Sequence, residues 1–102
     1  LSNERYVSKN RPGFESHFIT LHDGPTIELM TLPDLPDAPT HPEFIGWAHI
    51  AINVGSKAQV DRMAAQAQAN GTLLSAPRMT GDGFYEAVIA DPDGNRIELV
   101  GA

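Results

Sequence analysis

A histidine and two glutamates are the side chains of this sequence best suited to bind a metal ion together. Glu28, His49 and Glu98 each lie in a segment where aliphatic residues alternate with other types, a pattern typical of strands. In each segment the residue takes the face opposite to the aliphatic side chains. Imidazole nitrogen and carboxylate oxygen suit Zn, Ni, Mn or Fe. A single strand glutamate or histidine is more often solvated or hydrogen-bonded, so the metal-site hypothesis depends on the three lying together.

A repeated hairpin relates the two glutamates. Residues 13–30 align without a gap on residues 83–100, an offset of 70, and eight of the eighteen positions are identical. Asp-Gly before an apolar run is a common hairpin turn, because glycine supplies the positive φ that such turns need. The turn does not require the glutamate that both copies keep between Ile and Leu. The match therefore indicates an internal repeat.

The spacing of apolar residues predicts an α+β fold built from two related modules. The second copy reads β-α-β-β-β, with a helix at 57–70 and strands at 47–54, 72–79, 84–90 and 95–100. Ser56 and Gln59 form a capping box, Gly71 ends the helix, and Pro77 indicates that its strand lies at a sheet edge. The first copy shows strands only, at 5–8, 14–22 and 26–31. We expect paired β-α-β-β-β modules forming a curled mixed sheet around a cleft, the first module lacking its opening strand and helix.

The predicted organisation is one structural domain. Residues 1–32 form the partial first module, 33–43 a linker with four prolines, and 44–102 the complete second module.

The faces opposite to the aliphatic side chains also predict the walls of the cleft. With Glu28, His49 and Glu98 in the cleft, its apolar walls are five side chains: Phe14, Phe18, Trp47, Phe84 and Val88. Glu86 shares this face, but the first copy has Ser16 at the equivalent position. We therefore expect that Glu98→Gln loses metal whereas Glu86→Gln keeps it.

Composition excludes several classes of protein. The net charge of −6 and the lack of a Lys/Arg cluster argue against binding to nucleic acid or to an anionic membrane. The chain has no cysteine, hence neither a disulfide framework nor a cysteine-based zinc site. No apolar run is long enough to span a bilayer, and no signal-like segment opens the chain. We expect a cytoplasmic protein with a small-molecule substrate.

The repeated modules resemble the vicinal oxygen chelate superfamily, which includes glyoxalase I, bleomycin-resistance proteins and extradiol dioxygenases. The matching segments are 46–54 (GWAHIAINV), 91–100 (DPDGNRIELV) and the end of the first hairpin, 27–30 (IELM). They are most similar to the small bacterial glyoxalase-I-like branch. The resemblance implies that Glu28, His49 and Glu98 bind one divalent metal, with Zn or Ni favoured over Mn or Fe. It also implies that Glu98 moves a proton and that Glu28 is its catalytic counterpart.

The sequence departs from this family at its start. The offset places the first-module histidine at 49 − 70 = −21, before Leu1. The chain is thus expected to be a fragment, or to have its cleft completed by a second chain. The missing elements leave an unpaired sheet edge, from which we expect a homodimer with strand or module exchange.

Three functions stay open. The first is a glyoxalase-I-like lyase or isomerase acting on a thiohemiacetal or similar oxygen chelate, with Arg11 or Arg78 as candidates for holding an acidic substrate. The second is a metal-free binding protein of the bleomycin-resistance type. An iron-dependent extradiol dioxygenase fits less well, because this superfamily uses two histidines and one carboxylate for that reaction.

Overall fold

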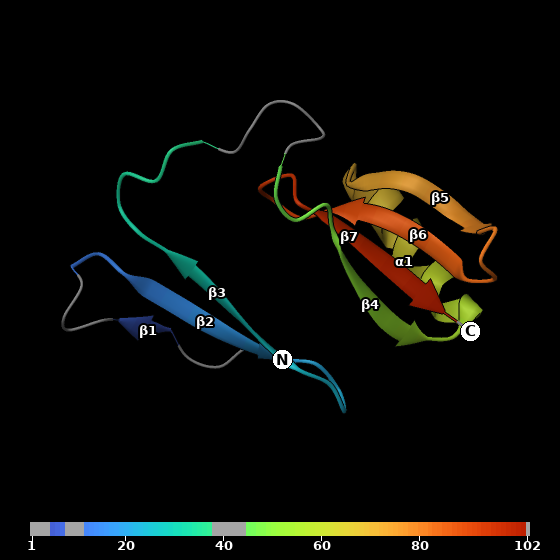
Figure 1. Cartoon of the computed structure of the whole chain (residues 1–102), viewed down its shortest axis with the longest axis horizontal. Helices are drawn as coiled ribbons and strands as arrows, with labels where there is room; N and C mark the ends of the chain where they lie inside the picture. The colour runs from blue at the N-terminus through green and yellow to red at the C-terminus, as the bar shows by residue number, and fades with distance from the viewer. Residues whose placement is uncertain (1–4, 8–11, 38–44, 102) are drawn as a thin grey trace. The chain divides into compact units, whose positions relative to one another are not determined.

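The computed structural model describes residues 5–7, 12–37 and 45–101, in two compact units (Figure 1). The first unit is Leu1–Asp37 and the second is Ala38–Ala102. The prediction that the two modules form one structural domain stays a prediction.

The first unit contains a sheet of three antiparallel strands. They are β1 (Tyr6–Val7), β2 (Glu15–Thr20) and β3 (Thr26–Thr31), in the order β1-β2-β3. The side chains of Arg5 and Glu15 form an ion pair of 2.9 Å beside the first two strands. This hairpin region matches the strands predicted for the first copy, apart from end residues.

The second unit is the predicted β-α-β-β-β module. Its elements are β4 (Ile50–Gly55), α1 (Lys57–Asn70), β5 (Leu73–Met79), β6 (Tyr85–Ala90) and β7 (Arg96–Gly101). The strand order is β4-β7-β6-β5, with β4 parallel to β7 and the other pairs antiparallel. The strand that contains Pro77 lies at an edge, as its proline predicts. The α+β fold class with curled sheets is confirmed.

The two hairpins share one register. Each of the six pairs between β2 and β3, from Glu15↔Thr31 to Thr20↔Thr26, recurs 70 residues later between β6 and β7. The turns match as well. Leu21 N–H donates to Pro25 O at 3.0 Å, and Asp91 N–H donates to Asn95 O at 2.9 Å. The repeat read from the sequence is therefore a repeat of backbone structure.

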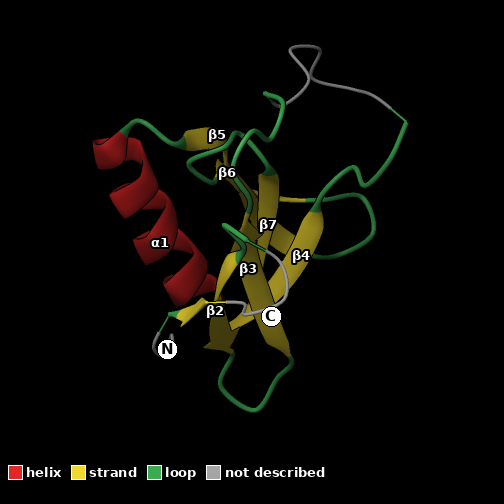
Figure 2. Ribbon diagram, turned by 90° about the vertical axis from the view of Figure 1, so that its left-hand side faces the viewer, coloured by secondary structure: helices red, strands yellow, loops and turns green. Residues whose placement is uncertain are grey.

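Helix α1 covers one face of the second sheet (Figure 2). Ser56 adopts an extended conformation, and its Oγ accepts the N–H of Gln59 at 3.2 Å, which satisfies one free donor of the first turn. Gly71 ends the helix in the left-handed region with φ 76°. The core between helix and sheet consists of small and branched side chains: Val60, Ala64, Ala67, Ala87 and Leu99.

Gly101 lies where this sheet meets the start of the helix. A Cβ added there would lie 2.5 Å from the Ser56 carbonyl oxygen and 2.9 Å from Val60 Cγ2. The end of β7 thus needs a residue without a side chain, because backbone approaches it closely. This contact fixes β7, the strand of Glu98, against α1.

The sequence placed the start of β4 too early. The strand predicted from Trp47 begins at Ile50, and Trp47 is 88% exposed. Because the Trp47 side chain is largely exposed, its packing does not require residue 47 to belong to a paired strand. Among the described residues, no helix has the length and apolar character needed to cross a membrane.

Candidate functional site

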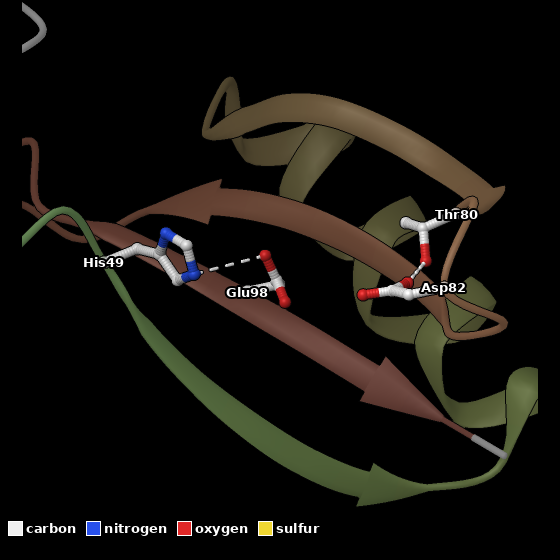
Figure 3. A network of polar contacts seen from close by, with 4 residues as sticks. All are labelled: His49, Thr80, Asp82 and Glu98. Atoms are coloured by element: carbon white, nitrogen blue, oxygen red, sulfur yellow. Dashed lines mark hydrogen bonds and ion pairs between the residues drawn. The ribbon is translucent and has the colours of Figure 1, made fainter.

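His49 and Glu98 form a close polar pair on the sheet of the second unit. His49 Nε2 lies 3.3 Å from Glu98 Oε2, and their side chains are 44% and 20% exposed (Figure 3). Glu98 on β7 pairs with Ala51 on β4, and His49 precedes Ala51 by two residues, which places both polar side chains on one face. Ile97 and Leu99 point to the opposite, helix-covered side. The predicted face assignment for these two residues is therefore correct.

The spacing of this pair fits a shared metal ion. Nitrogen and oxygen donors that each lie about 2.1 Å from one ion at a tetrahedral angle are separated by roughly 3.4 Å. The observed separation of 3.3 Å is close to that value. One imidazole and one carboxylate also match the ligand types that Zn and Ni accept. The donor types and the spacing of this pair are those expected of two ligands in a four-coordinate metal site.

Glu86 on β6 is a neighbour of Glu98 on the same face of the sheet, as face parity predicts. Its pKa is raised, first by a hydrogen bond with the Glu98 side chain, then by desolvation and by the negative charges of Glu98 and Asp82. Arg78, its cross-strand partner on β5, acts in the opposite direction. Glu86 is a diagonal neighbour of Glu98, and diagonal neighbours on one sheet face are within reach of long side chains. The prediction that Glu86→Gln keeps metal stays a prediction.

Glu28 occupies the equivalent position in the first unit. It lies on β3 opposite Phe18, as Glu98 lies on β7 opposite Val88, and it is exposed. Among the described residues, no three histidine, aspartate or glutamate side chains gather closely enough to bind one ion. The structure therefore brings His49 and Glu98 together, and the third ligand stays a prediction.

The residues predicted to bind substrate differ in their exposure to solvent. Val88 is half-buried beside Glu98, whereas Trp47 and Phe84 are 88% and 53% exposed. Phe14 and Phe18 are half-buried in the first unit. Arg11 lies outside the described residues, and Arg78 is exposed beside Glu86.

The turn before Phe84 is held by Thr80. Its hydroxyl donates to the Asp82 carboxylate and accepts the Phe84 N–H at 3.2 Å (Figure 3). The hydrogen bond from Thr80 is the main reason that the pKa of Asp82 is lowered. This turn fixes the backbone that presents the exposed Phe84 ring at the start of β6.

Comparison with known proteins adds the family context. The family model described as the Glyoxalase/Bleomycin resistance protein/Dioxygenase superfamily matches residues 4–99. Comparison of the sequence with curated proteins found no significant match.

Several solved structures have a similar fold. A glyoxylase/bleomycin resistance protein/dioxygenase domain from Frankia sp. EAN1pec has a TM-score of 0.77 and 14% identity, over 97% of this chain and 73% of that one. A glyoxalase I variant from Zea mays has a TM-score of 0.73 and 18% identity, over 97% of this chain but 35% of that one. A lactoylglutathione lyase from Agrobacterium tumefaciens has a TM-score of 0.57 and 20% identity, over 97% and 75%. At these identities the likeness extends to the fold alone.

Proposed function

The chain belongs to the Glyoxalase/Bleomycin resistance protein/Dioxygenase superfamily, and from that premise we propose that it is a metal-dependent lyase or isomerase. Its substrate is a small molecule with two adjacent oxygen atoms, of the thiohemiacetal type. The observation that carries the proposal is the 3.3 Å approach of His49 Nε2 to Glu98 Oε2, at a spacing that suits a shared metal ion.

The bound metal, Zn or Ni rather than Mn or Fe, would polarise the substrate oxygens. Glu98 is the group of this chain that takes a proton from the substrate carbon and returns it at the neighbouring position. His49 keeps the Glu98 carboxylate directed toward the sheet face that has no helix. Glu28, which shares the register position of Glu98, is proposed as a further ligand and catalytic counterpart.

Metal content and turnover test this proposal. Protein purified without chelator should carry about one Zn or Ni ion per site by elemental analysis. It should also convert a glutathione thiohemiacetal, and chelation should abolish that activity. Protein without metal that stays inactive after Zn or Ni is added would refute the proposal.

A metal-free binding protein is the second candidate, and the exposure of two aromatic side chains favours it. Trp47 is 88% exposed and Phe84 is 53% exposed, so both rings are free to stack on an aromatic or amphipathic ligand. Trp47 is the only tryptophan of the chain, so its fluorescence reports on binding nearby. Absence of metal, together with a saturable fluorescence change on adding an aromatic ligand, would favour this function over the enzyme.

A further inference from the structure

We infer that Arg96 binds the negatively charged group of a small acid, which is the ligand of the sheet face that α1 does not cover. Arg96 opens β7 and precedes Glu98 by two residues, so parity places both side chains on that face. The parallel pairing of β4 with β7 begins at Ile50↔Ile97, and His49 and Arg96 directly precede this pair. His49 also lies 3.3 Å from Glu98, and Arg96 is exposed. An exposed guanidinium therefore adjoins the His49–Glu98 pair.

The Arg96 guanidinium is accessible to such a ligand. No carboxylate of the described residues lies within ion-pair distance of it. Its cross-strand neighbour on β6 is Ala90, whose methyl group is too short to cover it. The donors of a guanidinium form a planar fork, which binds a carboxylate or phosphate through two parallel hydrogen bonds. Arg96 can therefore offer this fork to a bound anion.

The other described lysine and arginine residues of the second unit are less suited to this role. Lys57 and Arg62 lie on α1, which covers the opposite face of the sheet. Arg78 pairs with Glu86 across β5 and β6, so a carboxylate already opposes its charge. The net charge of the chain is −6, which repels an anion at long range, so binding one needs a cation at the site. Beside the His49–Glu98 pair, Arg96 is that cation.

The spacing along β7 defines the ligand. Residues two apart on a strand are separated by about 7 Å. An acid whose negative group lies about 7 Å from two adjacent oxygen atoms can therefore reach Arg96 while those oxygens lie at the His49–Glu98 pair. The adjacent oxygens rest on the proposed function, and Arg96 adds the acidic group to that substrate.

The test compares binding of 3,4-dihydroxybenzoate with binding of 3,4-dihydroxybenzamide. The two probes share the ring and the adjacent oxygens, and they differ in charge. By calorimetry, the zinc-loaded full chain should bind the acid about tenfold more tightly than the amide. Arg96→Gln should bind both with equal affinity, to within about twofold, whereas Arg78→Gln, the matched change on β5, should keep the preference. Arg96 is exposed, so the fold should persist, which thermal unfolding checks.

Failure of this inference and failure of the proposed function give different results. If wild-type protein takes up no zinc, the proposed function fails, and the same comparison of acid and amide in metal-free protein decides the role of Arg96. If wild type does not prefer the acid, the inference is overturned. The same holds if Arg96→Gln keeps the preference, or if Arg78→Gln alone loses it.

Discussion

Glu28 and Glu98 are equivalent residues of two hairpins that share one register at a constant offset of 70. Phe18 pairs with the first glutamate across β2 and β3, and Val88 pairs with the second across β6 and β7. Their surroundings differ, however. Glu98 has His49 and Glu86 beside its carboxylate, whereas Glu28 is exposed on a strand whose neighbour offers Ser16. The same equivalence relates Leu29 to Leu99, which provides a matched control for one prediction below.

Replacing Glu98 by glutamine should remove metal and leave the fold intact. The amide is a poor metal ligand, so Zn²⁺ affinity should fall by at least ten- to a hundredfold. Ile97 and Leu99 keep their places beneath α1, so thermal unfolding should change little. Titration calorimetry and thermal unfolding measure the two effects. Asp93→Asn, a matched change in the exposed turn before β7, is the control, and equal zinc affinity of the two variants would contradict a metal site at Glu98.

Substitution by alanine should lower the free energy of unfolding by very different amounts at Leu99 and at its equivalent, Leu29. Leu99 is 2% exposed, so Leu99→Ala should lower the free energy of unfolding by about 2–5 kcal/mol. Leu29, at the same hairpin position, is 52% exposed, and Leu29→Ala should stay within about 0.5 kcal/mol. Urea denaturation followed by circular dichroism measures both. Similar costs would mean that Leu29 is buried in solution.

The first turn of α1 should depend on Ser56. Its Oγ accepts the Gln59 N–H, so Ser56→Ala should cost about 1 kcal/mol of unfolding free energy. Ser56→Gly should cost only a few tenths of a kcal/mol, roughly, because glycine is itself acceptable at this position. Denaturant unfolding of the three proteins gives the order. If Ser56→Gly were less stable than Ser56→Ala, the backbone freedom of glycine in the unfolded chain would cost more free energy than its suitability at the capping position recovers.

Tyr85 should make stability sensitive to alkaline pH. Its hydroxyl donates to the Asp61 carboxylate, which links β6 to α1 and raises the pKa of Tyr85. The protonated form is the one favoured in the folded state. Its stabilisation is fully present below the ordinary tyrosine pKa of about 10, and it is lost as pH rises through the higher folded pKa. The stability difference between wild type and Tyr85→Phe should therefore shrink between about pH 9 and pH 12. A difference independent of pH would contradict the link.

Sequence patterns predicted the repeat, the module order and the facing of His49 and Glu98. These features depend on the periodicity of apolar residues and on turn chemistry, and residues close together in the sequence determine both. The start of β4 was placed three residues too early, because an apolar run does not reveal where pairing with β7 begins. The interaction of Glu86 with Glu98 was missed for a related reason. Its contact with Glu98 depends on the register between two strands, and the sequence analysis compared repeat positions without considering diagonal neighbours.

The parallel pairing of β4 with β7 has a kinetic consequence for the site. Pairing Ile50 with Ile97 closes a loop of 47 residues, whereas pairing Ala90 with Arg96 closes one of 6. The longer closure costs about 1.8 kcal/mol more in chain entropy. Helix α1 also packs less against β4 than against the other three strands. We expect β4 to dock after the β6–β7 hairpin and to open first, which native-state hydrogen exchange would detect as faster exchange in β4 than in β6. Since His49 directly precedes β4, its contact with Glu98 is made and lost with the docking of that strand.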